Sequence, residues 1–170
     1  MPKKPTIILG HSLGAFIAFE FAKFQQARMS SQHLKGLMCV AATAPHLNDT
    51  RKNLHQLDDE ALVRKLLDFE GTPSLILEDK ELLKLFLPRI RADFKLAETY
   101  VPLDFSPIDI GIIALAATED KIVPCDQAFE WKNYSARQFD YIECPGSHFF
   151  LHENLNQEAP RIFRLARHLN

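Results

Sequence analysis

Thr6-Ile7-Ile8-Leu9-Gly10-His11-Ser12-Leu13-Gly14-Ala15 combines a strand signal, a turn signal and a helix signal within one short segment. Its first four residues are β-branched or apolar, which favours a short buried strand, and the apolar residues from Leu13 onward favour a helix. The sequence therefore predicts a strand, a tight turn and a helix in direct succession. We expect Gly10 and Gly14 to be glycine because the backbone folds back on itself there and leaves no room for a side chain.

The Gly-X-Ser-X-Gly pattern of this turn is typical of a nucleophile elbow, where a strained strand-to-helix turn presents a serine hydroxyl at the carboxyl edge of a sheet. The first N–H groups of the following helix favour negative charge beside that serine. We therefore predict Ser12 as a nucleophile and the Leu13 N–H as an oxyanion-hole donor. The pattern also occurs by chance, so an ordinary surface serine on a glycine-rich turn is the alternative.

Composition and charge describe an ordinary globular protein. The chain has 170 residues, 46% hydrophobic and 25% charged, and this predicts one domain over residues 1–170. Its 20 basic and 22 acidic residues give a net charge of −2 without long blocks of either sign, so no nucleic-acid or membrane partner is implied. No apolar run reaches the about 18 residues of a membrane span, and polar residues interrupt the amino-terminal apolar stretch too early for a secretory signal.

The three cysteines, Cys39, Cys125 and Cys144, are an odd number and stand far apart. This spacing argues against a disulfide framework and against a zinc site. We therefore predict a protein of the reducing cytoplasm that holds no metal.

Further along the chain, apolar runs that suit buried parallel strands alternate with helical patterns. The arrangement predicts an α/β fold with a parallel sheet of about four strands. Besides the first strand, the predicted elements are a helix over Leu13–Gln26, strands over Gly36–Ala44, Ile110–Ala117 and Gln138–Cys144, and helices over Pro124–Tyr134 and Gln157–His168 with Ile162, Phe163, Leu165 and Ala166 on its apolar side.

A charged, helical region interrupts this alternation at about residues 47–100, between core segments 5–46 and 106–170. A helix begins near Leu57-Asp58-Asp59-Glu60, and Gly71-Thr72-Pro73 breaks it. Short helices are expected from Ser74 to Pro88, and another from Arg89 to Thr99. A helical insertion between strands is typical of a lid over the strand ends where ligands bind. One face of its first helix carries Ala61, Leu62, Leu66 and Leu67.

Two loops after later strands carry further chemistry. Asp120 follows one buried strand and His148 follows the next, so the chain order Ser12, Asp120, His148 is that of an α/β hydrolase. His148 would act as the base that activates Ser12, and Asp120 would orient it. Glu119 or Asp126 could equally supply the acid.

The histidines divide into one catalytic candidate and a remainder. His148 is the candidate because it alone follows a strand in a Gly-X-His turn, although packing beside Phe149 and Phe150 is its alternative. We expect surface or packing positions for the others: His11, His33, His46, His55, His152 and His168.

Several segments of the chain together form a distinctive set. They are Gly-His-Ser-Leu-Gly-Ala at 10–15, the lid run 57–73, Leu87–Phe94 with Glu98 and Tyr100, Thr118-Glu119-Asp120 before Trp131, and Gly146-Ser147-His148-Phe149-Phe150. This set resembles type II thioesterases, the stand-alone editing enzymes of nonribosomal peptide and polyketide synthesis. The resemblance runs from about Thr6 to Leu151, and the lid segment Leu-Pro-X-X-Arg-Ala-Asp-Phe is its most discriminating part.

This resemblance implies hydrolysis of a thioester between an acyl group and the phosphopantetheine arm of an acyl or peptidyl carrier protein. The arm belongs to the substrate, so no separate cofactor is implied. A serine triad suffices without a metal because a thiolate leaves easily. By the resemblance, the lid side chains that would line the acyl route are Leu83, Phe86, Leu87 and Phe94. Taken one position at a time, their apolar pattern favours simple packing of the lid helices instead.

The sequence departs from these thioesterases at its start. Their elbow strand lies in mid-sheet after several earlier strands, whereas here it begins at Thr6. We therefore expect a truncated α/β-hydrolase fold with an exposed edge at Thr6–Leu9, which would bind a partner or a second copy. The second oxyanion-hole N–H would also be missing, and losing one such donor costs on the order of 10²–10³ in turnover.

Two other functions remain open. A catalytically inactive remnant could bind a carrier protein through the lid or accept a strand at the open edge. A hydrolase of small oxygen esters would use the same fold.

Overall fold

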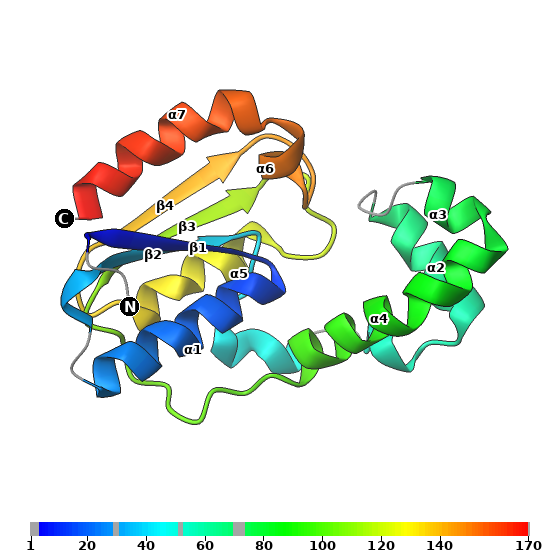
Figure 1. Ribbon diagram of the computed structural model, residues 1–170, viewed down its shortest axis with the longest axis horizontal. Coiled ribbons are helices and arrows are strands. Elements are labelled where there is room, and N and C mark those ends of the chain that lie inside the picture. The colour runs from blue at the N-terminus through cyan, green and yellow to red at the C-terminus, as the bar shows by residue number, and fades with distance from the viewer. Residues whose placement is uncertain (1–3, 29–30, 51–52, 70–73, 170) are drawn as a thin grey trace.

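The computed structural model describes residues 4–28, 31–50, 53–69 and 74–169 (Figure 1). Its centre is a sheet of four parallel strands, as the sequence predicted, and the structure shows the strand order to be β1-β2-β3-β4. His11 pairs with Val40, and Ala117 with Cys144, so the strands end together at one edge of the sheet. The strands are β1 (Thr6–His11), β2 (Leu34–Val40), β3 (Gly111–Ala117) and β4 (Phe139–Cys144).

Helices cover both faces of this sheet (Figure 1). On one face lie α1 (Leu13–Ala27) and α5 (Cys125–Phe129), and on the other lies α7 (Leu155–Ala166). Alternate side chains of β2 enter the two cores, because successive residues of a strand point to opposite faces. Leu37 and Cys39 pack toward α1, whereas Met38 and Val40 pack with α7. The short elements that complete the core region are η1 (Ser31–His33), η2 (Pro45–Thr50), η4 (Glu130–Tyr134), α6 (Phe150–Glu153) and η5 (Arg167–Leu169).

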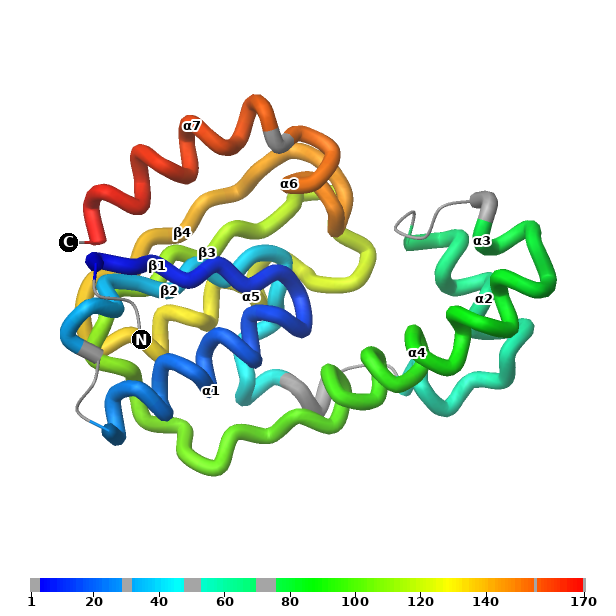
Figure 2. The backbone as a smooth tube through the Cα atoms, in the orientation of Figure 1, coloured from blue at the N-terminus to red at the C-terminus, as the bar shows by residue number. Residues whose placement is uncertain are grey.

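The region between β2 and β3 forms a helical lid that stands apart from the sheet (Figure 2). It contains η3 (Leu54–Gln56), α2 (Asp59–Asp68), α3 (Ser74–Glu78) and α4 (Lys80–Thr99). The predicted helix start is correct: Asp58 caps α2 and accepts a 2.7 Å hydrogen bond from the N–H of Ala61. The lid has a small hydrophobic core of its own, built around Leu62, Leu66 and Leu87. The predicted break at residues 71–73 lies outside the described residues.

The predicted helix boundary at Pro88 is wrong, because α4 continues through it from Lys80 to Thr99. A proline inside a helix removes one hydrogen bond and strains the preceding turn. Here Leu83 and Leu87 before Pro88, and Ile90 and Phe94 after it, pack into the same lid core. Packing on both sides therefore holds the two halves together as one helix.

Three other expectations need correction. Leu67 and Phe163 face solvent, although the apolar patterns assigned them to buried faces. A Cβ at Gly14 would meet no atom within 4 Å, so the predicted crowding applies to Gly10 alone. The helix expected over 124–134 is α5 followed by the tighter η4, which leaves Trp131 and Tyr134 buried against α1.

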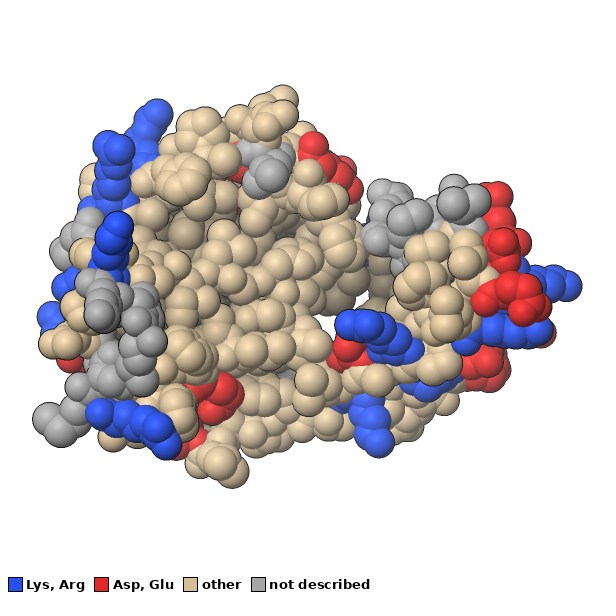
Figure 3. Space-filling model, viewed as in Figure 1, with Lys and Arg blue, Asp and Glu red and all other residues tan. Residues whose placement is uncertain are grey.

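β1 is an edge strand of the described sheet, since β2 is the strand paired with it. Leu9 is exposed on this strand, and Ile17, Phe21 and Phe24 are exposed on α1. Figure 3 shows Lys and Arg along one rim of the core and side chains of both charges on the lid, while the surface over β1 is almost free of charge. The predicted open edge at Thr6–Leu9 is therefore present in the structure. Within the described residues, no helix is both long and apolar enough to cross a membrane.

Candidate active site

Ser12 occupies a strained turn between β1 and α1. Its backbone has φ 53° and ψ −120°, in the positive-φ range that side chains rarely adopt. Such strain typically costs about 1–3 kcal/mol and persists where the surroundings enforce it. The N–H of Ser12 donates a 2.8 Å hydrogen bond to the carbonyl of Val40, and a Cβ on Gly10 would lie 2.3 Å from the carbonyl oxygen of Gly14. The turn is therefore held by β2 on one side and by close backbone packing on the other.

Leu13 is the first residue of α1, a helix of 15 residues. Its N–H is one of the groups for which an α-helix provides no internal acceptor, and the helix dipole makes this end electropositive. Leu13 and Ser12 line the same cavity. An N–H at this position can therefore stabilise negative charge that develops beside the serine oxygen.

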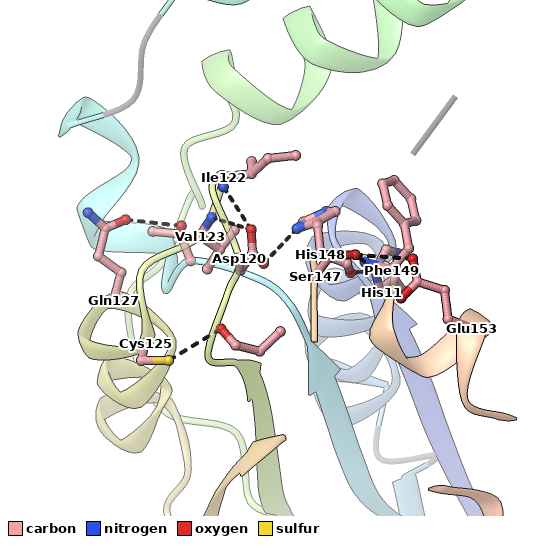
Figure 4. A network of polar contacts seen from close by, with 12 residues as sticks. His11, Asp120, Ile122, Val123, Cys125, Gln127, Ser147, His148, Phe149 and Glu153 are labelled. Carbon is pink, nitrogen blue, oxygen red and sulfur yellow. Dashed lines mark hydrogen bonds and ion pairs between the residues drawn. The ribbon is translucent and has the colours of Figure 1, made fainter. Parts of the chain in front are cut away.

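Asp120 and His148 form a buried pair at the carboxyl edge of the sheet (Figure 4). His148 Nδ1 lies 2.7 Å from Asp120 Oδ2, and the two side chains are 4% and 0% exposed. The other oxygen, Asp120 Oδ1, accepts hydrogen bonds of 2.7 and 2.9 Å from the N–H groups of Ile122 and Val123. With the carboxylate as acceptor, Nδ1 carries the hydrogen and Nε2 is left to accept a proton.

The two alternative acids are placed differently. Glu119 and Asp126 are both exposed, and the carboxylate of Asp126 accepts a hydrogen bond from the adjacent Gln127 N–H. Asp120 is the carboxylate that contacts His148, as its position directly after a strand predicted. 

Backbone hydrogen bonds join the loops that carry the pair. Thr118 N–H donates to the carbonyl of Cys144, and Glu119 N–H donates to that of Gly146, so the loop after β3 continues the sheet pairing beyond its last strand residues. Gly146 has φ 116°, a conformation that favours glycine, and this turn directs the chain into the His148 loop.

Ser12 and His148 are not directly bonded to each other. Among the residues that the structure describes, no hydrogen bond joins Ser12 Oγ to His148. Catalytic hydrogen bonds are often long without substrate, and transfer of a proton needs either direct contact or one bridging water. The geometry thus brings together two of the three predicted residues. It places the third, Ser12, at the end of β1, which β2 separates from β3 in the sheet.

Ser12 opens onto a cavity of about 500 Å³ between the sheet and the lid. Most of its wall is apolar, and its charged groups lie mainly on α2, at Glu98 and on the loop after β3. Lys121 Nζ donates a 3.2 Å hydrogen bond to the carbonyl of Asp68 at the end of α2, which joins the lid to the core at the cavity wall. The lining residues are Ser12, Leu13, Phe16, 41–43, Leu54, Lys65, Asp68, Phe69, Phe94, Ala97, Glu98, 121–124 and Gln127.

The four lid residues assigned to an acyl route have different surroundings. Phe94 lines the cavity, as expected. Leu83 and Leu87 pack within the lid core instead, and Phe86 is partly exposed to solvent. Leu54, Phe69 and Ile122 also line the cavity, although the sequence patterns did not single them out. Leu54 and Phe69 come from the lid, and Ile122 comes from the loop after β3.

His11 makes a contact with the His148 loop that the sequence patterns did not predict. It was expected at the surface or in simple packing, but its Nε2 lies 2.8 Å from the backbone carbonyl oxygen of His148. Burial, the largest influence, lowers the pKa of His11 from its ordinary value of 6.5. Its position directly before Ser12 was the available signal.

None of the described residues forms a group of three or more His, Cys, Asp or Glu side chains placed to hold a metal ion. All three cysteines are free thiols. Burial raises the pKa of Cys39 well above its ordinary value, and burial followed by the nearby Glu158 carboxylate raises that of Cys144 to about 11. Both thiols are therefore poor nucleophiles near neutral pH.

Comparison with known proteins gives one consistent family. A family model described as the thioesterase domain matches residues 1–168. The gramicidin S biosynthesis protein GrsT of Aneurinibacillus migulanus is 33% identical over 152 residues, which are 88% of this chain and 58% of that protein. Thioesterase PikA5 of Streptomyces venezuelae is 35% identical over 148 residues, which are 87% of this chain and 52% of that protein.

A solved structure agrees with these sequence matches. YbtT, a type II thioesterase from the yersiniabactin NRPS/PKS biosynthetic pathway, is similar with a TM-score of 0.87 and 28% identity, over 99% of this chain and 68% of that one. The present chain spans little more than half the length of the two curated relatives. Its architecture is that of the α/β-hydrolase fold. The chain belongs to the thioesterase family.

Proposed function

We propose that this chain hydrolyses the thioester between an acyl group and the phosphopantetheine arm of a carrier protein, in nonribosomal peptide, polyketide or fatty-acid synthesis. The observation that carries the proposal is the buried Asp120–His148 pair at the strand ends, beside a cavity that Ser12 lines. The similarity to type II thioesterases supports the choice of a thioester substrate.

Each residue has a defined role in the proposed reaction. A serine hydroxyl is a weak nucleophile until a base removes its proton, so His148 Nε2 takes the proton of Ser12 as the oxygen attacks the thioester carbonyl. The Leu13 N–H donates to the oxyanion of the tetrahedral intermediate. His148 then gives its proton to the departing thiolate, and a water molecule repeats the sequence to release the acid. Asp120 holds the imidazole and stabilises its cation.

The cavity suits the acyl part of such a substrate. Phe16, Leu54, Phe69, Phe94 and Ile122 supply apolar side chains from both the core and the lid. Apolar contact with the substrate gives binding free energy in proportion to the area removed from water. An acyl chain would thus lie between lid and sheet while the arm enters from the carrier protein. The arm is part of the substrate, so the proposal needs no separate cofactor, and free thiols agree with a cytoplasmic setting.

A covalent probe tests the activation of Ser12. A fluorophosphonate reacts with an activated serine, so the wild-type chain is expected to gain one label, located at Ser12 by mass spectrometry. Ser12→Ala and His148→Ala should prevent labelling, whereas Ser106→Ala, a change at an exposed serine far along the chain, should not. Labelling that persists in Ser12→Ala would refute the assigned nucleophile.

The substrate class needs a separate measurement. The chain should cleave an acyl-phosphopantetheinyl carrier protein with a higher kcat/KM than an oxygen ester of the same acyl group. Faster cleavage of the oxygen ester would favour a small-ester hydrolase, and binding of the carrier without turnover would favour a binding module.

A further inference from the structure

His11 connects the strand that precedes Ser12 to the loop that carries His148. It is the last residue of β1 and directly precedes Ser12, and its ring reaches the loop that follows β4. His11 Nε2 lies 2.8 Å from the backbone carbonyl oxygen of His148 (Figure 4). One short side chain therefore connects the strand that carries Ser12 to the residue that carries the imidazole.

Ring packing reinforces this hydrogen bond. The ring centroid of His11 lies 5.0 Å from that of His148 and 5.5 Å from that of Phe149, and the latter two are 5.0 Å apart. Three aromatic rings thus meet at the end of the sheet. Edge and tilted contacts of this kind favour one relative orientation over others. The hydrogen bond to the backbone carbonyl of His148 holds the loop in place, and the ring contacts limit rotation of the His11 side chain.

The chemistry of the contact determines which nitrogen of His11 bears hydrogen. A carbonyl oxygen only accepts hydrogen bonds, so Nε2 must donate. Burial favours the neutral ring, since it lowers the pKa of His11. A neutral donor at this position supports the carbonyl of His148 without placing a second positive charge beside the base.

We propose that His11 is a positioning residue that sets the distance between Ser12 and the His148 imidazole. This inference rests on the proposed function and deepens it. Asp120 controls the tautomer and rotation of the imidazole from one side, whereas His11 fixes the backbone of the same residue from the Ser12 side. Misplacement of a catalytic group by about 1 Å can cost on the order of 10²-fold in rate.

Two substitutions separate the hydrogen bond from the ring. His11→Phe keeps an aromatic ring of similar shape between His148 and Phe149 but removes the donor. His11→Gln keeps a donor at the place of Nε2 but removes the ring. His168→Phe, an exposed histidine in η5, is the matched control.

The expected kinetic result is a loss of kcat with little change in KM. His11→Phe should lower kcat on the acyl carrier protein about 10- to 100-fold, while KM stays within about 2-fold. His11→Gln should restore kcat to within about 3-fold of wild type. The melting temperatures of both variants should lie within about 5 °C of wild type, as for the loss of one hydrogen bond. Equal kcat in His11→Phe and wild type, or equal loss in both variants, would overturn the proposal.

A spectroscopic measurement tests the same inference and does not depend on enzymatic activity. The proton between His148 Nδ1 and Asp120 should give a downfield NMR signal in wild type. It should shift or broaden in His11→Phe and return in His11→Gln. An unchanged signal and unchanged backbone shifts for residues 146–150 in His11→Phe would refute the positioning role. If the NMR signal responds to the two substitutions as expected but the wild-type chain shows no turnover, the proposed function is refuted and the positioning role of His11 is not.

Discussion

At the scale of single residues, the geometry of the site depends on the different hydrogen-bond partners of the two carboxylate oxygens of Asp120. Oδ1 accepts from the N–H groups of Ile122 and Val123, and Oδ2 faces His148. The carboxylate cannot rotate without breaking two backbone hydrogen bonds. His148 is thereby given one acceptor in one direction, which fixes Nε2 as the nitrogen that accepts a proton.

Asp120→Asn should keep the fold and lose activity. The amide oxygen can replace Oδ1 toward Ile122 and Val123, but the remaining NH₂ group would face His148 Nδ1 and favour the wrong tautomer. We expect kcat to fall on the order of 10⁴-fold, measured on the acyl carrier protein with circular dichroism as the check of folding. Asp126→Asn is the matched control and should stay within about 2-fold of wild type. A larger loss from Asp126→Asn than from Asp120→Asn would contradict the assignment.

The lowered pKa of His11 makes stability depend on pH in a defined window. Below its ordinary pKa of 6.5, the unfolded chain binds a proton at His11 that the folded chain resists. The free energy of unfolding should therefore fall as pH decreases from 6.5 to the lower pKa of the folded state. The charges of His148 and His152 lower the pKa of His11 further, whereas the charge of Asp120 raises it.

Melting curves of wild type and His11→Gln between pH 7.5 and 5 measure this contribution. The stability of wild type should decrease more over this range than that of His11→Gln, which keeps the donor but cannot be protonated. Parallel curves for the two proteins would show that His11 does not titrate differently on folding.

The sequence predicted Asp120 and His148 because both follow strands whose carboxyl ends meet at one edge. Only the order of elements along the chain is needed for that prediction. The contact of His11 could not be predicted in this way, since it joins residues 137 positions apart through a ring and a backbone carbonyl. The lining of the cavity could not be predicted in this way either, because Leu54 and Phe69 line it through the tertiary position of the lid relative to the core.

At the scale of elements, a buried carboxylate links two parts of the lid. Glu98, 5% exposed near the end of α4, accepts hydrogen bonds from the N–H groups of Leu54 and His55 at 2.8 and 3.1 Å. His55 Nδ1 lies 2.5 Å from the same side chain. Arg91, one to two turns earlier on α4, donates to the carbonyls of His55 and Leu57. The position of η3 against α4 is therefore set by polar contacts as well as by the lid core.

Glu98→Ala should loosen η3 from α4. The change leaves two backbone N–H groups without their acceptor, which should cost about 3 kcal/mol of local stability. Hydrogen exchange should show faster exchange at Leu54 and His55 while β2 and β3 keep their protection. Glu81→Ala, which removes an exposed ion pair with Lys84 on the same helix, should cost at most about 0.5 kcal/mol. Equal exchange at Leu54 in both variants would contradict the role of Glu98.

Elements were predicted well where one local signal dominated. The run Leu57-Asp58-Asp59-Glu60 was enough to predict the start of α2, and continuous apolar runs predicted β2 and β3 within a few residues. The predicted helix boundary at Pro88 was wrong, because long-range packing outweighs the local helix-breaking effect of the proline. Leu83 and Leu87 on one side and Phe94 on the other share one cluster, and such tertiary contacts leave no mark in a local pattern.

At the scale of the whole molecule, the surface divides into a charged lid and an almost uncharged face over β1 (Figure 3). β1 presents an unpaired strand edge, and the adjacent α1 exposes Ile17 and Phe21, at 59% and 42%. An exposed strand edge next to apolar side chains favours association with another chain. We therefore propose that the isolated protein self-associates through this face.

Sedimentation over a range of protein concentrations tests that proposal. The weight-average mass of wild type should rise with concentration, and the double change Ile17→Glu and Phe21→Glu should reduce the rise by charging the face. Leu85→Glu, at a lid position that is 70% exposed, controls for the added charge and should leave association unchanged. A wild-type chain that stays monomeric at all concentrations would contradict the proposal.

Ser12 is proposed to drive thioester hydrolysis in this chain. The most direct test of this role is the rate at which the 170-residue chain hydrolyses an acyl-phosphopantetheinyl carrier protein, measured beside Ser12→Ala with both proteins shown to be folded. We predict turnover that falls at least about 10³-fold in Ser12→Ala. Equal rates in the two proteins, or no turnover by the folded wild type, would contradict it.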